Sequence, residues 1–359
     1  MNVYVLNGLN GIIDVCDTYE SLIWNTQYFG ESEFQLVVGG TPENVEKFKV
    51  GRYLLKENDY HEDLSMHNVM LIERRELMWD IEQGWKLTLT GGGLKNLLKR
   101  RVVWNQTSLT GKIEKVIRQV ILDNVITPSD PNRVMPNFIL DAEKGFSDEF
   151  AVAETDDQLS GEILTDWLVS VCQKYEIGWD VYIANGKYVF TLYKGKDRSF
   201  SQTDLVPVVF SPEYDNLVTS TYIEDYSEFR NAGVVLGEGE GSAQRIVSVG
   251  TATGMDRYEL MIDGSSVSSN TIITLPVYLD MLRSFGNEQL SASNETEIFE
   301  GQVIANGLYT LGVDYDLGDV IQIENENKIS AKSRITEVIY SEDENGITYL
   351  PTFGNWVDD

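Results

Sequence analysis

The sequence has few of the residues that most often carry enzyme or metal chemistry. Its 359 residues include two histidines, His61 and His67, and two cysteines, Cys16 and Cys172. The histidines do not have a metal-ligand spacing for a helix, and neither lies in a motif such as H-E-x-x-H. Few forms of general-base catalysis by imidazole are therefore open to this chain. We expect both histidines in surface loops, with a zinc or triad role as the alternative.

The two cysteines lie far apart in the sequence, and Cys172 falls on the apolar face of a predicted helix. Two buried free thiols are the simplest interpretation, because free cysteine behaves as a small hydrophobic residue. A disulfide and a catalytic thiol are the alternatives.

Basic residues are scarce as well. The chain has 28 Lys and Arg against 57 Asp and Glu, a formal net charge of −29 at pH 7. Binding to nucleic-acid phosphates or to an anionic membrane surface needs clustered cations, so this composition argues against both. The acidity serves solubility, or it repels DNA in a conduit through which DNA slides without sticking.

Long apolar runs are also missing. No run approaches the ~20 residues that span a bilayer, and the first residues, from Met1 to Gly11, have no basic segment followed by a long apolar one. We therefore expect neither a membrane-spanning segment nor a signal peptide. Hydrophobic residues make up 42% of the chain, enough to build folded cores, and its length indicates two or three domains.

The first part of the chain, residues 1–104, has the pattern of β-strands. Segments rich in aromatic and β-branched residues predict strands at 22–28, 34–38, 52–55, 68–73 and 85–90. Thr41, Pro42 and Glu43 have the order of an N-cap, a first-turn proline and a first-turn acid. They predict a short helix to about Lys49 that stops near Gly51.

Residues 105–204 have a different pattern. Thr110 can cap a helix whose apolar residues recur at helical spacing, namely Ile113, Val116, Ile117, Val120 and Ile121. Residues 127–150 contain three prolines and predict a long loop with little regular structure. A second helix is expected from Ser160, closed by Gly178, and Asn185-Gly186 predicts a type I′ hairpin between strands at 179–183 and 187–193. We interpret this part as a small α+β domain inserted into a β scaffold.

From residue 205 the pattern is again that of short strands. Strands are expected at 218–223, 232–236, 246–249, 258–262, 299–304, 320–324, 333–340 and 348–350. One helix, from about Pro276 to Phe285, is expected to end at Gly286, and Asn345-Gly346 predicts another tight hairpin. Strands at this spacing indicate a Greek-key barrel or a curled sheet.

The expected fold class is therefore mainly β with an α+β insertion. We predict a first barrel-like domain at residues 1–104, which part of residues 205–240 can complete. An inserted α+β domain is expected at 105–204, and a second barrel-like domain at 205–359.

Two segments have the composition of a binding loop without meeting its requirements. The run 237–241, Gly-Glu-Gly-Glu-Gly, has acids where a phosphate loop needs open N–H groups and a lysine, so a turn is expected. The segment from Asp314 to Asp319 has the start of a calcium loop, but Asn325 stands where an EF-hand has glutamate. A tight turn is expected there, with a weak divalent-ion site as the alternative.

Basic and aromatic residues offer two candidate contact surfaces. One basic cluster, interpreted as a solvated helix end or as a docking patch for an acidic neighbour, contains Lys95, Lys99, Arg100 and Arg101. Trp79, Trp85 and Trp104 are candidates for an exposed aromatic cluster. Because a strand tryptophan is more often buried, we expect buried packing for these side chains.

Several segments near the two ends of the chain share packing and turn residues with a known family. The N-terminal ones begin at Gly11 (Gly-Ile-Ile-Asp), Tyr19 (Tyr-Glu-Ser-Leu-Ile-Trp), Gly30 (Gly-Glu-Ser-Glu-Phe) and Gly51 (Gly-Arg-Tyr-Leu), and the C-terminal ones lie at 314–320, 334–338 and 351–354. The chain thereby resembles siphovirus tail-tip hub proteins, called tail-associated proteins, which are similar to the baseplate hubs of contractile phages. The resemblance covers most of the chain and is thin in 105–200.

This resemblance implies a structural role at the tail tip of a phage or prophage particle, assembled in the bacterial cytoplasm. Hub proteins of this kind form trimers in which each subunit contributes two similar barrel-like domains, so three copies make a pseudo-sixfold ring. For this chain it implies a homotrimer that contacts the tail tube protein, the distal tail protein and other tip or baseplate proteins. DNA would pass through its channel without specific binding. No catalytic residue, metal or cofactor is implied.

Two other classes stay open. A tail-tip peptidoglycan hydrolase would use two carboxylates, and with 57 acids some pair at that spacing is unavoidable. Many relatives carry hydrolase or host-binding modules after the family-like segments, whereas this chain ends at Asp359, so we expect no enzyme. A host-surface binding module is the second alternative, and it would show an exposed aromatic cluster.

Overall fold

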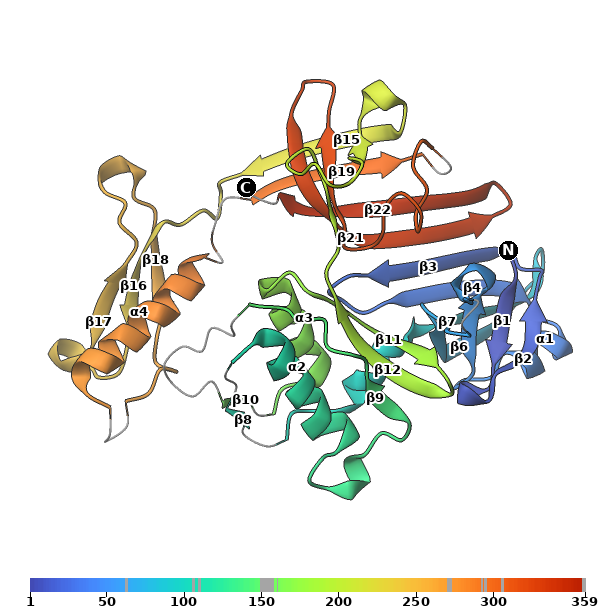
Figure 1. Cartoon of the computed structure of the whole chain (residues 1–359), viewed down its shortest axis with the longest axis horizontal. Helices are drawn as coiled ribbons and strands as arrows, with labels where there is room; N and C mark the ends of the chain where they lie inside the picture. Colours follow the sequence, from blue (N-terminus) through green and yellow to red (C-terminus); the bar gives the residue numbers. More distant parts are fainter. Residues whose placement is uncertain are drawn as a thin grey trace.

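The computed structural model describes residues 1–61, 64–104, 107–108, 111–148, 158–159, 161–269, 273–291, 293, 296–304 and 307–356. In this part of the chain strands hold 40% of the residues and helices 23%, so the predicted mainly β fold is confirmed. Figure 1 shows a large sheet built from both ends of the chain, a helical layer beneath it, and a small unit to one side. Thr110 and Ser160, where the two middle helices were expected to start, lie outside the described residues.

The largest sheet has 14 strands and joins the two ends of the chain. Its main path runs in the order β15 (Leu217–Asp225), β19 (Thr296–Val303), β22 (Gly346–Trp356), β21 (Ser330–Asp343), β3 (Ser21–Gln27), β4 (Glu33–Gly39), β7 (Gly84–Gly93), β6 (Met70–Asp80), β5 (Tyr53–Lys56), β1 (Val3–Leu6) and β2 (Ile12–Cys16). Off this path, β20 (Val320–Glu324) pairs with β21, and β13 (Asp197–Arg198) and β14 (Val209–Phe210) pair with β20.

The pairing of β3 with β21 makes this sheet continuous. The two strands are antiparallel, from Leu22 opposite Glu342 to Gln27 opposite Glu337. The amide of Asn25 also donates to the carboxylate of Glu337 at 2.7 Å across this pairing. Because β3 pairs with β4 on its other side, the N-terminal and C-terminal strand sets form one body.

Short helices and turns connect the strands of the sheet. α1 (Pro42–Lys47) begins as predicted, because the Thr41 hydroxyl accepts the Asn44 N–H at 3.2 Å, and it ends at Lys47. Further 3₁₀ segments are η1 (Gly8–Asn10), η2 (Glu57–Asp59), η6 (Pro212–Tyr214), η7 (Gly241–Ala243) and η8 (Gly254–Asp256), and the short strands β8 (Thr107–Ser108) and β10 (Gln158–Leu159) pair with each other.

Two helices and a three-stranded sheet form the layer beneath the large sheet (Figure 1). α2 (Ile113–Ile121) buries the predicted apolar face and continues into the π-helical turn η4 (Leu122–Ile126), and α3 (Leu164–Lys174) packs near η3 (Leu94–Arg100). The small sheet has the order β11 (Gly178–Ala184), β12 (Lys187–Tyr193) and β9 (Phe138–Leu140). Side chains of this layer share one hydrophobic core with Leu6, Leu55 and Leu71 of the large sheet.

Two predictions in this layer are confirmed and another is wrong. The described residues 127–148 have little regular structure, as predicted: they contain η5 (Pro131–Arg133) and β9, whose residues pair in parallel with β12. Gly178 does not close α3, since it is the first residue of β11, and the left-handed residue after the helix is Glu176 with φ 52°. The hairpin at Asn185-Gly186 is confirmed, with Ala184 opposite Lys187.

A small unit lies to the side of the large sheet (Figure 1). Its sheet has the order β17 (Ile246–Val249), β16 (Ala232–Leu236) and β18 (Glu259–Asp263), and α4 (Leu275–Ser291) covers it with a hydrophobic core of its own. The prediction that Gly286 ends this helix is wrong. A Cβ atom at Gly286 would lie 2.4 Å from Cγ2 of Val235, so the glycine allows helix and sheet to approach closely.

Tyr28, at the end of β3, lies where three parts of the chain meet. Its hydroxyl accepts the Gly195 N–H at 3.2 Å and is 3.3 Å from the carbonyl oxygens of Glu176 and Tyr193. A Cβ atom at Gly178, or at Gly318, would lie 2.2 Å from Cε2 of Tyr28, so both positions need glycine. The predicted domain boundaries at residues 104 and 204 stay a prediction.

Candidate assembly surface

The β6–β7 hairpin extends beyond the core of the large sheet. Met70, Leu71 and Ile72 at the start of β6 are buried, whereas every residue from Glu73 to Asp80 is exposed. The register with β7 shifts between Ile72 and Arg74. Such a bulge bends a strand and increases its twist, so the outer part of the hairpin leaves the layer that the core covers.

Local hydrogen bonds fix the turn at the end of this hairpin. One carboxylate oxygen of Asp80 accepts the backbone N–H groups of Glu82 at 2.8 Å and Gln83 at 3.1 Å. Gly84 follows with φ 72°, a conformation that glycine adopts at little cost. Trp79 then pairs opposite Trp85 in the ladder. The turn is therefore shaped by the hairpin itself.

Large apolar side chains gather on residues 77–85, which we name the hairpin tip. The exposed fractions are 84% for Ile81, 57% for Trp79, 55% for Trp85, 54% for Met78 and 46% for Leu77. The ring centroids of Trp79 and Trp85 are 6.5 Å apart. The expectation that these tryptophans are buried is wrong, because the hairpin carries them past the core.

Trp104, the third candidate, does not belong to the hairpin tip. It is also exposed, but the guanidinium group of Arg133 lies 4.6 Å from its ring centroid, and its backbone N–H donates to Asn124. The predicted cluster therefore reduces to the pair Trp79 and Trp85. The signal for their exposure is the run of four charged residues at 73–76, which cannot all lie on one face of a strand.

The charges near the hairpin tip leave it acidic. The cations of the hairpin are engaged within the chain: Lys86 with Glu20 at 2.6 Å, Arg74 with Glu76, and Arg75 with the backbone carbonyls of Val45 and Phe48. Asp80 and Glu82 form no ion pair within the described part of the chain. The hairpin tip thus presents an apolar centre beside two carboxylates that have no ion-pair partner in the described part of the chain.

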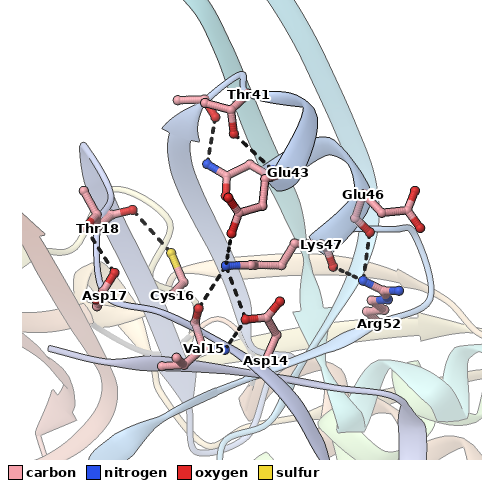
Figure 2. A network of polar contacts seen from close by, with 12 residues as sticks. Asp14, Val15, Cys16, Asp17, Thr18, Thr41, Glu43, Glu46, Lys47 and Arg52 are labelled. Atoms are coloured by element: carbon pink, nitrogen blue, oxygen red, sulfur yellow. Dashed lines mark hydrogen bonds and ion pairs between the residues drawn. The ribbon is translucent and has the colours of Figure 1, made fainter.

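The end strand β2, near α1, is a second exposed apolar segment, but side chains occupy its outer edge (Figure 2). The Val15 N–H donates to the Asp14 carboxylate at 2.8 Å, and the Val15 carbonyl accepts the Lys47 ammonium at 3.1 Å. Lys47 also lies 3.3 Å from the Asp14 carboxylate. Side chains that take up the backbone groups of an end strand hinder pairing with another strand. We therefore regard the hairpin tip, and not β2, as the candidate assembly surface.

Residues 2–355 match the family of siphovirus ReqiPepy6 Gp37-like proteins. The chain belongs to this family. The predicted resemblance to a siphovirus protein family is confirmed. A search of curated proteins finds no match to its sequence.

Solved structures of prophage tail proteins have the same fold as this Gp37-like protein. The 43 kDa tail protein of prophage MuSo2 from Shewanella oneidensis has a TM-score of 0.57 and 11% identity, covering 99% of this chain and 98% of that one. Prophage tail protein gp18 from Listeria monocytogenes has a TM-score of 0.54 and 8% identity, covering 100% and 96%. The tail protein from Neisseria meningitidis has a TM-score of 0.53 and 13% identity, covering 98% and 96%.

The two histidines of the Gp37-like protein lie in the loop before β6, as expected. Their ring centroids are 4.9 Å apart, and the His67 ring stacks on Tyr182 at 4.5 Å. Both line a cavity of about 540 Å³, together with Asp59 and Asp180. In the described part of the chain, no group of three or more His, Cys, Asp or Glu side chains is placed to hold a metal ion.

The segment from Asp314 to Asp319 forms the predicted tight turn. The buried carboxylate of Asp319 accepts the Lys196 N–H at 2.7 Å, the guanidinium of Arg198 at 2.8 Å and the Asp316 N–H at 3.1 Å. These bonds fasten the turn before β20 to β13. The other candidate loop, 237–241, leads from β16 to β17, where the Glu238 carboxylate accepts hydroxyl and N–H groups of Ser268 and Ser269.

The predicted basic cluster is not one exposed patch. The Lys95 ammonium is buried and donates to the carbonyls of Gln27 at 2.6 Å and Gly30 at 3.2 Å. Its burial lowers the pKa of Lys95 to about 8. Lys99 pairs with Glu31. Lys95 therefore holds the chain between β3 and β4 in place, which sequence position alone does not reveal.

Both cysteines of the Gp37-like protein are free and buried, which confirms the expectation. Burial raises the pKa of the Cys172 thiol to about 12 and also raises that of Cys16, so both stay protonated near neutral pH. No helix among the described residues has the length and apolar character needed to cross a membrane.

Proposed function

We propose that this chain is a structural hub at the distal end of a phage or prophage tail. Three copies form a pseudo-sixfold ring that joins the tail tube to the tip or baseplate proteins and leaves a channel for DNA. The location at the tip, the homotrimer, the two barrel-like domains and the gating of the channel all belong to this proposal.

The pairing of β3 with β21 is the observation that carries it. One cluster of buried side chains, which includes Val5, Trp24 and Leu36, lies in the N-terminal strand set and extends to Tyr340 of β21. A second cluster, which includes Phe210 and Ile335, lies within the C-terminal set. The chain thus holds two strand sets side by side, and most of the buried apolar side chains of each set pack within that set. Three such chains place six strand sets in a ring, which suits a junction between sixfold and threefold neighbours.

The charge of the chain supports passage of DNA without binding. With a net charge of −29, a ring of this protein repels the phosphate backbone at any distance within the screening length of the solution. Non-specific affinity for DNA comes from clustered cations. The basic cluster predicted from the sequence does not form one exposed cationic patch, because Lys95 is buried and Lys99 is paired with Glu31.

We propose a structural role and not a catalytic one. The thiols are buried, and the Asp319 carboxylate is held by donors of the chain itself. The hydrolase alternative is tested by a zymogram on bacterial peptidoglycan with the purified chain. Lysis that disappears on replacement of one specific acid would overturn the structural role.

The copy number is tested in solution and in the particle. Light scattering at several concentrations should give three times the chain mass of 40.6 kDa at the higher concentrations. Electron microscopy of purified tails should show a threefold ring of this chain at the distal end, located with an antibody or a tag. Tails that carry the chain at another place, or in rings of two or six copies, would contradict the proposal.

A further inference from the structure

We propose that the hairpin tip is a plug that inserts into an apolar pocket with a basic rim on a different protein of the tail. The inference concerns residues 77–85 alone. It rests on the proposed place of the chain in a phage tail, and it holds for a ring of any copy number.

The first argument is the concentration of exposed apolar surface at one point. Trp79, Ile81 and Trp85 are each more than half exposed, with Met78 and Leu77 beside them. Contiguous apolar patches on a soluble protein mark binding surfaces, whereas single exposed apolar residues are ordinary. Tryptophan is enriched among the residues that carry most of the binding energy of an interface. A pair of tryptophans 6.5 Å apart is therefore a suitable anchor.

The second argument is the fixed shape of the hairpin tip. Asp80 accepts two backbone N–H groups of the turn, and Gly84 supplies its left-handed residue. The ladder then holds Trp79 opposite Trp85. A segment that already has its bound shape loses little conformational entropy on binding, so more of its contact energy becomes affinity.

The third argument concerns the chemistry of the partner. Asp80 and Glu82 stand beside the apolar side chains without an ion pair in the described part of the chain, so the complementary surface has Lys or Arg at its rim. A second copy of this chain is a poor match for the hairpin tip, because its candidate basic cluster is divided, with Lys95 buried and Lys99 paired with Glu31. An anionic lipid surface is disfavoured because the chain has a net charge of −29. A different protein with a basic rim fits both the apolar and the charged features.

The partner can be found by photo-crosslinking in assembled tails. Ile81, the most exposed large apolar residue of the hairpin tip, is replaced by p-benzoylphenylalanine in the full chain, and purified tails are irradiated and analysed by mass spectrometry. We expect a crosslink to one different tail protein, at an apolar residue that has Lys or Arg nearby. The crosslink should be lost when Trp79→Ala and Trp85→Ala are added. Crosslinks to this chain alone, or none at all, would overturn the inference.

The affinity of the full chain for the crosslinked protein then separates the apolar contribution to binding from the charged one. Trp79→Ala should weaken binding by ~30-fold or more, the factor that corresponds to ~2 kcal/mol. Glu82→Lys should also weaken it, with an effect that shrinks in high salt because exposed charges are screened. Trp104→Ala is the matched control, since Trp104 is equally exposed but lies outside the hairpin, and it should change binding less than two-fold.

Vesicles test the membrane alternative directly. Wild type and Trp79→Ala, Trp85→Ala are floated with vesicles of zwitterionic lipid and of zwitterionic lipid mixed with anionic lipid. We expect neither protein to float. Flotation of the wild type that the double variant loses would identify a bilayer as the target and overturn the protein plug. If the proposed trimer is wrong, light scattering will give another mass and electron microscopy another ring symmetry. Neither result changes the crosslink expected from the hairpin tip.

Discussion

Arg334 and Glu176 form an ion pair in which Nη2 of the arginine lies 2.8 Å from Oε2 of the glutamate. The pair joins β21 to the end of α3. Arg334 also donates from Nη1 to the Gly318 carbonyl at 2.7 Å, and its guanidinium lies 5.6 Å from the Tyr28 ring centroid. The Arg334 side chain is only 10% exposed, whereas that of Glu176 is 55% exposed, so we expect the two partners to contribute unequally to the stability of the fold.

Replacement of these two residues should have unequal effects on stability. Glu176→Gln should cost less than ~1 kcal/mol, because its carboxylate is largely in water. Arg334→Met should cost about 2 kcal/mol, because it leaves the buried Gly318 carbonyl without its donor. Urea unfolding measures both losses. Arg283→Met is the control, since its partner Asp280 is exposed, and equal losses for all three variants would contradict this account.

A methyl group at Gly178 should disturb the junction around Tyr28. Gly178→Ala should cost ~1–3 kcal/mol, because the new Cβ atom would lie 2.2 Å from the Tyr28 ring and neighbouring groups must shift. Gly39→Ala is the matched control in another strand of the chain, where the nearest atom to a new Cβ is 4.0 Å away. Thermal unfolding compares the two variants. If Gly39→Ala lowers the melting temperature as much as Gly178→Ala does, close packing at Tyr28 is not the reason.

Gly286→Ala should weaken the small unit although alanine favours helix formation. The gain in helix propensity is ~1 kcal/mol, whereas overpacking against Val235 and Val249 costs ~1–3 kcal/mol. Hydrogen exchange should become faster for backbone amides of β16, β17 and β18 and stay unchanged in β3. Adding Val235→Ala should restore part of the protection. Slower exchange in Gly286→Ala alone would show that the glycine has no packing role.

Lys95 should give the stability of the protein a pH dependence of known sign. Burial lowers its pKa from 10.5 to about 8, so between these values the unfolded chain holds a proton that the folded chain has lost. Stability relative to Lys95→Met should therefore rise with pH across this window, by up to about 3 kcal/mol. Urea unfolding of both proteins at pH 7, 9 and 11 measures the difference. A difference that stays constant, or falls with pH, would rule out a depressed pKa for Lys95.

Local features of the fold could be predicted because neighbouring residues decide them. The Thr41 cap of α1, the buried face of α2 and the turn at Asn185-Gly186 all follow from spacing and turn chemistry. The pairing of β3 with β21 could not, because nothing in the residues 21–27 specifies a partner that lies more than 300 positions later in the chain.

Glycine and tryptophan show where sequence patterns are ambiguous. Gly286 and Gly178 follow helical patterns in the way a terminating glycine does, yet each allows a close approach that depends on a distant segment, at Val235 and at Tyr28. Trp79 and Trp85 have the pattern of core residues in strands, and only the bulge before Arg74 and the length of the hairpin place them in solvent. The sequence therefore identified these tryptophans as candidates for a contact surface, but it did not predict that they lie in solvent.

The continuous sheet has a consequence for biosynthesis. β3 leaves the ribosome early, but its partner β21 follows only after ~300 further residues, which takes on the order of tens of seconds at ordinary translation rates. During that time one side of β3 has backbone donors and acceptors without their final partner, and unpaired strand edges are sites of aggregation. Any nascent chain released before β21 is complete keeps this side open. An incomplete chain therefore exposes the same strand that unites the finished protein.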